Sequence, residues 1–126
     1  MTLEIIRTDA APAPGGAYSQ GVKTGRTVTT AGQVGINPVT GEVPATFAEQ
    51  VRLSIRNLAA VLEAGGATLN DVVKTTCFVT DVANFAEFNA IYAEEFGDHR
   101  PARSTVGVAL AGGFLFEIEA VAILPE

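Results

Sequence analysis

Cysteine, histidine and basic residues are all scarce in this sequence. One cysteine and one histidine among 126 residues are too few for a Cys/His metal site, and the carboxylates lack the spacing of a calcium loop. The lone thiol of Cys77 can form no disulfide within the chain, which fits a reducing cytoplasm. We therefore expect neither a metal site nor a disulfide cross-link.

Basic charge is limited as well. Eight Lys and Arg residues stand against 14 Asp and Glu, giving a net charge of −6. Binding to nucleic-acid phosphates requires clustered basic side chains, whereas here they are scattered. Arg52 and Arg56 fall one helical turn apart, but Glu49 and Glu63 lie in the same segment, as is typical of a solvated helix face. Nucleic acid is not expected as the main ligand.

Long hydrophobic runs are missing too. No uninterrupted apolar stretch reaches the roughly 18 residues that span a bilayer, and the first 14 residues do not have the pattern of a secretion signal. Yet 48% of the residues are hydrophobic, too many for a disordered chain. A chain of this length buries roughly two-thirds of its unfolded surface, so we expect one domain over residues 1–126.

Hydrophobic periodicity and turn residues predict the order of the elements. A helix should begin at Thr46, which has the capping-box spacing with Glu49, and end at Gly65-Gly66. A second helix is predicted from about 84 to 96. Strands are predicted at 3–7, 27–31, 34–36, 72–80, 103–110 and 114–124. This order favours an α+β domain with both helices on one face of a mixed sheet.

The same patterns predict which side chains share a face. In the strand over 72–80, period-two alternation places Val73, Thr75, Cys77 and Val79 together. The sheet face opposite the helices would remain open. If that face is apolar, it should be buried against other copies of the chain.

Arg103 is a candidate for anion binding. Alternation places Arg103, Thr105 and Gly107 on one face of their strand, away from the apolar side. An arginine that faces a glycine at the start of a strand can form a fork for a carboxylate. The alternative is an exposed arginine at a strand end, on the polar face and outside the core.

The last strand carries two carboxylates on one face. Glu117 and Glu119 should lie about 7 Å apart, on a strand whose two faces are both largely apolar and which should therefore be central. Buried carboxylates are costly without partners. They are either ionised residues balanced by Arg or backbone N–H groups, or a catalytic site with Arg103 on a neighbouring strand.

Other chemistries find little support. There is no Gly-x-Ser-x-Gly elbow, and Cys77 has no nearby His, so core packing is its expected role. The segment Gly32-Gln33-Val34-Gly35 lacks both the phosphate-loop lysine and the dinucleotide pattern. His99 is expected to be an ordinary loop residue. Tyr18 either flanks a pocket or packs on the surface.

Two motifs together resemble the signature of the Rid (YjgF-like) family, in its arginine-bearing, imine deaminase branch. They are Pro101-Ala-Arg-Ser-Thr-Val106 and Phe116-Glu-Ile-Glu-Ala-Val-Ala122. Tyr18-Ser-Gln-Gly21, Thr30-Ala-Gly-Gln33 and Asp71-Val-Val-Lys-Thr-Thr76 also look like the family pattern, so the resemblance covers almost the whole chain.

The resemblance implies a fold and an activity. The fold would be a chorismate-mutase-like α+β domain in a homotrimer, whose sheets form a central barrel and whose sites lie in the clefts between subunits. The activity would be hydrolysis of 2-aminoacrylate-type enamines and imines (2-iminopropanoate, 2-iminobutanoate) to 2-oxo acids and ammonia, with no cofactor. No membrane or nucleic-acid partner is implied.

The resemblance also implies roles for six residues. The family arginine that pairs with the substrate carboxylate matches Arg103, and the glutamate associated with the attacking water matches Glu117. The remaining substrate-binding positions match the side chains of Tyr18 and Asn89, the backbone at Gly32, and the main chain at Thr105.

Two departures and several alternatives remain. Ala31 stands where many members have Ser, and Thr105 where many have Cys, so substrate preference is open. A trimeric module that binds 2-oxo acids without turnover is an alternative, as is a pathway-specific enzyme such as aminomuconate deaminase. Some family members carry ribonuclease, chaperone or translation-inhibitor labels, and the negative charge argues against the first of these.

Overall fold

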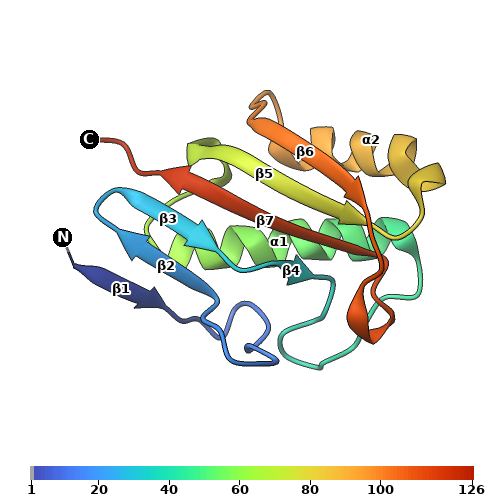
Figure 1. The fold of residues 1–126 in the computed structure, drawn as a ribbon, viewed down its shortest axis with the longest axis horizontal. Helices are drawn as coiled ribbons and strands as arrows, with labels where there is room; N and C mark the ends of the chain where they lie inside the picture. Colours follow the sequence, from blue (N-terminus) through green and yellow to red (C-terminus); the bar gives the residue numbers. More distant parts are fainter. Residues whose placement is uncertain (1) are drawn as a thin grey trace.

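The computed structural model describes residues 2–126 and shows a mixed β-sheet with two helices on one of its faces (Figure 1). The strand order is β1-β2-β3-β7-β5-β6, and the short β4 also pairs with β7. The expected α+β class and the placement of both helices on one face are confirmed. The elements are β1 (Leu3–Ile6), β2 (Gly21–Thr24), β3 (Thr27–Thr30), β4 (Gln33–Val34), α1 (Phe47–Ala64), β5 (Val72–Val79), α2 (Phe85–Phe96), β6 (Ala102–Gly107) and β7 (Phe116–Ile123), with single 3-10 turns at Leu69–Asp71, Val82–Asn84 and Ala111–Gly113.

The strand β2 was not predicted. It forms a hairpin with β3, in which Thr24 pairs with Thr27 across the two-residue turn Gly25-Arg26. Gly25 has φ +60°, a conformation that glycine adopts without steric cost, and glycine in a two-residue turn is a hairpin signal. The four residues of β2 include a glycine and a lysine, so hydrophobic alternation alone could not reveal the strand.

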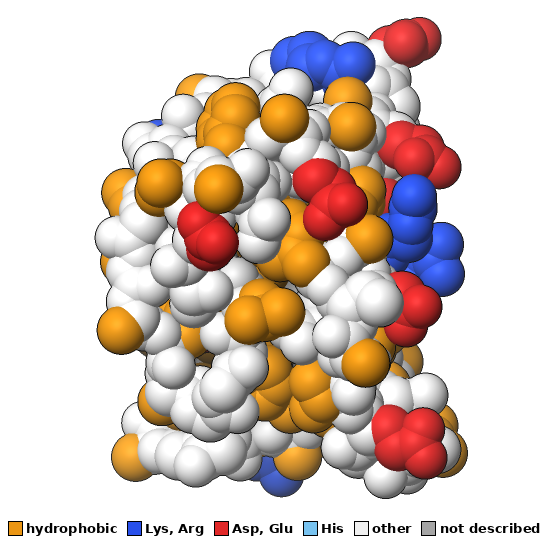
Figure 2. Space-filling model, turned by 90° about the vertical axis from the view of Figure 1, so that its right-hand side faces the viewer, with side chains coloured by type: hydrophobic (Ala, Val, Ile, Leu, Met, Phe, Trp, Pro, Cys, Tyr) orange, Lys and Arg blue, Asp and Glu red, His pale blue; other side chains and the backbone are white. Residues whose placement is uncertain are grey.

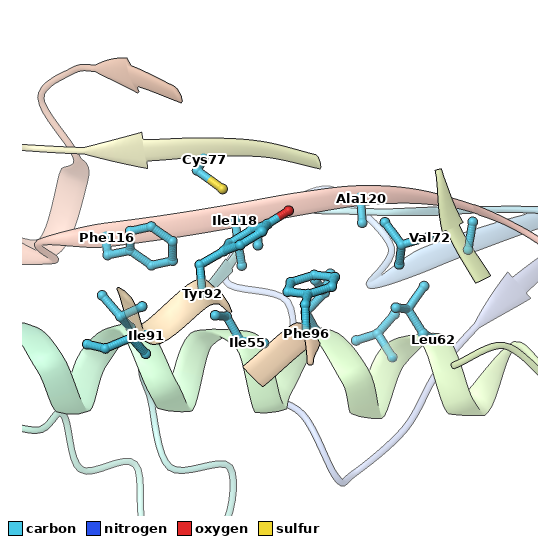
Figure 3. Close-up of a cluster of buried hydrophobic side chains, with 14 of the residues drawn as sticks. Ile55, Leu62, Val72, Cys77, Ile91, Tyr92, Phe96, Phe116, Ile118 and Ala120 are labelled. Atoms are coloured by element: carbon cyan, nitrogen blue, oxygen red, sulfur yellow. The ribbon is translucent and has the colours of Figure 1, made fainter. Parts of the chain in front are cut away.

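The helix α1 begins and ends where the sequence predicts. The Thr46 Oγ1 accepts a hydrogen bond from the backbone N–H of Glu49 at 3.2 Å, and the helix ends before Gly65. Its apolar stripe packs against the inward face of β7, so that side chains of Ile55 and Ile118 lie in one layer between helix and sheet (Figure 3). This layer is the core that fixes the sheet.

The inward face of β5 differs from the prediction at one position. A register shift between Val72 and Lys74 marks a β-bulge. Because a bulge adds one residue to a strand, side chains before it change face. Val73 is therefore exposed and Val72 is buried, whereas Thr75, Cys77 and Val79 are buried as expected.

The strand β7 is central, as predicted. It runs through the middle of the sheet (Figure 1), antiparallel to β3 and β4 on one side and to β5 on the other. Its residues alternate strictly: every second side chain from Phe116 to Ala122 is buried under the helices, whereas Glu117, Glu119 and Val121 are half-buried on the other face. The strand thus connects the core to the opposite sheet face.

The sheet face opposite the helices is partly apolar. Leu3 and Ile5 on β1 are 60% and 54% exposed, and Val106 on β6 is 39% exposed. These side chains alternate with residues that face the helices. No helix within residues 2–126 is long and apolar enough to cross a bilayer. Exposed apolar side chains such as Leu3, Ile5 and Val106 are of the kind that other protein commonly covers.

Candidate active site

Glu117 lies in a pocket on the open side of the sheet. It is the second residue of β7, paired with Phe78 on β5 and with Val34 on β4. The pocket has a volume of about 250 Å³ and includes Tyr18, Gly32 and Glu117 among its lining residues. Three of the six residues that the family resemblance singles out therefore lie together.

The pocket raises the pKa of Glu117. Burial of the carboxyl is the main cause, and the negative charge of Glu119 on the same strand face adds to it. Both favour the protonated form, because burial penalises a charge and a like charge repels it. Within residues 2–126 the Glu117 carboxylate has no hydrogen bond or ion pair. Its oxygen atoms are free to act on a ligand.

Gly32 allows the Glu117 side chain to take this position. A Cβ built on Gly32 would come within 2.7 Å of the Glu117 Cδ and would also collide with a carboxylate oxygen. A contact this short forces one group to move. The absence of a side chain at Gly32 therefore lets the carboxylate lie directly against the backbone that joins β3 to β4.

Tyr18 lies on a loop that one buried glutamine holds in place. Tyr18 is 53% exposed, and its hydroxyl oxygen accepts a hydrogen bond from the Gly15 N–H at 3.0 Å. The Gln20 side chain is 2% exposed. Its oxygen accepts from the Thr8 N–H at 2.7 Å, and its amide donates to the Thr8 and Pro12 carbonyls at 3.0 and 2.9 Å.

Gln20 is a site residue that the sequence did not reveal. Its backbone carbonyl accepts from the N–H of Ala31 at 2.8 Å, next to Gly32. It therefore ties the loop before β2 to the segment after β3, and both segments line the Glu117 pocket. The only signal in the sequence was its place in the Tyr18-Ser-Gln-Gly21 motif.

Arg103 lies on the other side of the sheet. It pairs with Thr75 across the parallel strands β6 and β5, and Thr75 is fully buried under the helices. The guanidinium carbon lies 4.7 Å from the ring centre of Tyr92 and 5.0 Å from that of Phe88. The expectation that Arg103 occupies a polar face outside the core is wrong, because its strand face is the one that α2 covers.

The Arg103 guanidinium has no polar partner in the described chain. Arg52 and Arg56 pair with carboxylates on α2, whereas no hydrogen bond or ion pair of Arg103 occurs within residues 2–126. A half-buried guanidinium has five N–H donors to satisfy. This arrangement suits an anionic ligand.

Asn89 and Thr105 belong to the Arg103 side. Asn89 is exposed on α2, one helical turn after Phe85, whose ring centre lies 5.6 Å from the guanidinium carbon. Residues four apart are neighbours on a helix surface. Thr105 follows Arg103 on the same face of β6 and is half-buried.

Within one chain the two groups stay apart. The strand β5 separates β6 from β7, so the expectation that Arg103 and Glu117 occupy neighbouring strands is wrong. The register places Glu117 opposite Phe78 and Arg103 opposite Thr75, and these two β5 residues point to opposite faces. The six candidate residues therefore fall into two separate groups, called here the two half-sites: the Glu117 half, with Tyr18 and Gly32, and the Arg103 half, with Asn89 and Thr105.

Cys77 and His99 have structural roles. Burial raises the pKa of Cys77 to about 12, so almost no nucleophilic thiolate forms near neutral pH. A ring nitrogen of His99 lies 2.6 Å from the carbonyl oxygen of Val72, which ties the loop after α2 to the start of β5. Neither residue lies in either half-site.

Comparison with known proteins decides the family. A family model described as endoribonuclease L-PSP matches residues 8–124. The chain belongs to this family, the Rid family. The match includes all six candidate residues and both half-sites.

Relatives and solved structures agree with this membership. The chain is 48% identical over 124 residues to the 2-iminobutanoate/2-iminopropanoate deaminase of Escherichia coli K12, covering 95% of this chain and 97% of that protein. RidA from an Antarctic Psychrobacter superposes with a TM-score of 0.93 at 41% identity, over 96% and 99% of the two chains. TdcF of Escherichia coli with bound serine gives 0.92 at 41% identity, over 97% and 99%. The Rid fold therefore extends over nearly the whole chain.

Proposed function

We propose that this Rid protein is an imine deaminase that hydrolyses 2-iminopropanoate, 2-iminobutanoate and similar enamine-derived imines to 2-oxo acids and ammonia. The observation that carries this proposal is the pair of uncompensated groups, a half-buried guanidinium without a polar partner and a carboxyl with a raised pKa. An imino acid offers a matching carboxylate and an electrophilic carbon. A relative 48% identical to this chain is named for that activity.

The chemistry needs only these groups and water. Arg103 would bind the substrate carboxylate through two parallel N–H bonds, which a planar guanidinium can form. Glu117 would accept a proton from a water molecule as the water oxygen bonds to the imine carbon, and would pass that proton to the imine nitrogen. In the resulting carbinolamine the hydroxyl proton also moves to the nitrogen, the C–N bond breaks, ammonia leaves, and the C=O bond of the 2-oxo acid forms. The step consumes one water and needs no cofactor.

The full site would require a second copy of the chain. Arg103 and Glu117 lie on opposite sheet faces, so one small substrate can meet both only where two chains adjoin. A homotrimer, the assembly expected from the family resemblance, would bury the open apolar face and bring the Glu117 half of one subunit to the Arg103 half of the next. Light scattering should give a mass near three chains. A stable monomer at micromolar concentration would contradict both the assembly and the shared site.

Ammonia release tests the activity. Imino acids generated freshly from a series of amino acids should release ammonia faster with the protein than without it, and a stable 2-oxo acid should compete. Binding of the 2-oxo acid without any acceleration would instead favour the non-catalytic binding module. A strong preference for one large imine would favour a pathway-specific deaminase, and Ala31 and Thr105 are the positions to vary.

Ribonuclease activity is not favoured, although the family model carries that label. The net charge is −6. On the face shown in Figure 2, the Lys and Arg side chains lie at the margins, while acidic side chains lie among hydrophobic ones. A surface of this kind repels a polyanion.

The free thiol of Cys77 is buried and fits a reducing compartment. We therefore propose that the protein is located in the cytoplasm.

A further inference from the structure

The Arg103 side chain is held by aromatic rings. Three rings of α2 surround the guanidinium carbon: Tyr92 at 4.7 Å, Phe88 at 5.0 Å and Phe85 at 5.6 Å. A guanidinium is attracted to the face of an aromatic ring within about 6 Å. A counter-ion would also hold the arginine, but it would occupy the N–H groups that a substrate carboxylate needs. Contact with a ring face leaves them free.

Tyr92, the nearest ring, is itself fixed on three sides. Its hydroxyl and that of Thr75 lie 2.8 Å apart and share a hydrogen bond. Phe96 stacks on it, with ring centres 4.4 Å apart and an angle of 22° between the planes. Phe88 packs edge-on at 5.6 Å. Figure 3 shows the Tyr92 ring between α2 and the sheet, with its oxygen directed toward the sheet.

The anchor of Tyr92 is the residue that pairs with Arg103. Thr75 lies on β5, directly opposite Arg103 on the adjacent strand β6, and is fully buried. The hydrogen bond with Thr75 therefore helps to fix the position of the Tyr92 ring, and this ring lies against the guanidinium. These two contacts connect the buried Thr75 to the free N–H groups of Arg103.

We propose that Tyr92 is a positioning residue for substrate binding: it holds the Arg103 guanidinium by its ring face, so that every N–H group remains available to a carboxylate. This inference rests on the proposed function, because it assigns Tyr92 to the binding of the imino-acid carboxylate. Tyr92 does not touch the reacting atoms. Its effect should appear in substrate affinity, with little change in the chemical step.

Three variants of the intact protein test the proposal. Tyr92→Leu removes the ring face. Tyr92→Phe keeps the face and removes only the hydroxyl bonded to Thr75. Phe96→Leu is the matched control, because Phe96 is as buried as Tyr92, at 4% exposure each. It stacks on Tyr92, whereas the rings against Arg103 within residues 2–126 are those of Phe85, Phe88 and Tyr92.

The expected results separate affinity from stability. Tyr92→Leu should raise KM for the imino acid and the Kd for pyruvate, a stable 2-oxo acid, by about 5- to 30-fold, with kcat changed much less. Tyr92→Phe should retain most of the affinity, because Phe88 and Phe96 still pack on the ring and hold its face against the guanidinium. Phe96→Leu should lower the melting temperature about as much as Tyr92→Leu and change Kd less than about twofold, since its contact does not reach the guanidinium.

A double-mutant cycle tests whether the effect passes through Arg103. In an Arg103→Ala background, Tyr92→Leu should cause no further loss of pyruvate binding. An equal loss in both backgrounds, or equal effects of Tyr92→Leu and Phe96→Leu on Kd, would overturn the proposal. If Tyr92→Leu does not fold, Phe85→Leu provides the same test on a smaller scale, because Phe85 is 44% exposed.

A spectroscopic measurement separates this proposal from the proposed function. Protons of the Arg103 side chain should show upfield ring-current shifts by NMR in the wild type and in Tyr92→Phe, and these shifts should be reduced in Tyr92→Leu. If the wild-type shifts are those of a solvent-exposed arginine, the proposed contact between the Tyr92 ring and Arg103 is overturned, whatever the activity. If the ring-current shifts and pyruvate binding are present but no imino acid releases ammonia, the deaminase proposal is overturned and the role of Tyr92 in carboxylate binding remains.

Discussion

The two half-sites keep a functional group unpaired by different physical means. In the Glu117 half the carboxyl lies against backbone: Gly32 leaves room for it, and burial raises its pKa. In the Arg103 half the guanidinium lies against aromatic rings, with Tyr92 nearest. The arginine is therefore positioned by ring faces, whereas the glutamate is accommodated by the absence of a side chain at Gly32. In both halves the hydrogen-bonding atoms remain free.

The halves differ also in how they connect to the core. Two of the rings around Arg103 belong to the buried layer between α2 and the sheet, where Phe88 packs with both Tyr92 and Phe116. Part of the wall around Glu117 is made of loop segments that Gln20 holds. Substitutions on the Arg103 side should therefore cost stability as well as activity. Substitutions on the Glu117 side should affect activity with little loss of stability.

Glu117→Gln should give the largest loss of activity. It keeps the shape of the side chain but removes the group that accepts a proton from water, and general-base contributions are typically about a hundredfold to ten-thousandfold in rate. The measurement is steady-state ammonia release. Pyruvate binding should be retained, because the carboxylate fork lies in the other half.

Wild-type rates in Glu117→Gln would reduce Glu117 to a structural role. Glu119→Gln is the matched control, because it changes the next carboxylate on the same strand face. It should keep most of the activity. Because it removes a repulsive charge from the neighbourhood of Glu117, it should lower the pKa of that carboxyl, and the acid limb of the pH–rate profile should move to lower pH.

Arg103→Lys should be nearly as damaging as Arg103→Ala. Lysine keeps the charge but cannot form two parallel bonds to a carboxylate. Charge-assisted bonds are worth roughly 1.5–3 kcal/mol each, so their loss should lower kcat/KM by about a hundredfold or more. Activity restored by Lys would show that charge alone suffices, and near-full activity in the Ala variant would remove Arg103 from the mechanism.

The same variants test the contrast in stability. Because the Arg103 guanidinium lies against three rings of α2, it packs on the face of the sheet that this helix covers. Arg103→Ala should therefore lower the melting temperature measurably, since an arginine can contribute through packing as well as charge. An unchanged melting temperature would mean that the rings hold the arginine in position but that the arginine adds nothing measurable to the stability of the fold.

The sequence predicts the helices and the central strand better than the strand faces at the edges. The stripe of α1 and the alternation of β7 are long periodic signals, and both are confirmed. Val73 was assigned to the wrong face because a bulge changes parity without a sequence mark. Arg103 was placed on a polar face because alternation shows which residues share a face, and not which face a helix covers.

The grouping of the site could not be read from the sequence either. Family resemblance names six residues, but only the register of β5, β6 and β7 shows that they form two halves on opposite faces. The importance of Gln20 depends on hydrogen bonds to residues 8 to 12 positions away. No periodic pattern reports contacts of that kind. The aromatic contacts of Arg103 were missed for the same reason.

Gln20→Met should have a smaller effect than the changes to Arg103 or Glu117. Methionine keeps the approximate volume but loses the bonds to the backbone of residues 8, 11 and 12. The loop that carries Tyr18 should loosen, and misplacing a pocket wall should lower kcat/KM by about tenfold. Ammonia release by the double variant with Tyr18→Phe should equal that of Gln20→Met alone, because a misplaced tyrosine contributes nothing.

Asp71→Ala is the control for Gln20→Met. The Asp71 side chain also holds backbone, accepting from the Thr68 N–H at 2.8 Å, but it lies outside the Glu117 pocket. It should affect stability and leave kcat/KM unchanged. Equal losses of activity in the two variants would show that Gln20 acts only through general stability.

The smallest predicted effect is a pH-dependent gain of stability in Glu117→Gln. In the wild type, burial and Glu119 raise the pKa of Glu117 above its ordinary 4.5 in the folded state. Below pH 4.5 the carboxyl is protonated in both folded and unfolded chains and costs nothing. As the pH rises from 4.5 to the raised pKa, the unfolded chain ionises more readily than the folded chain, so stability is lost over this interval and the loss is complete above the raised pKa. Glutamine carries no charge at any of these pH values. The melting temperature of the variant should therefore exceed that of the wild type at pH 7, and the difference should shrink as the pH falls toward 4.5.

Both proteins must be compared at the same concentration, because assembly contributes to the apparent stability. A difference that does not change with pH, or a variant less stable than the wild type at pH 7, would mean that the carboxylate is compensated in the assembled protein. In that event the contrast between the halves would end, because Glu117 would no longer be the uncompensated group that the single chain shows.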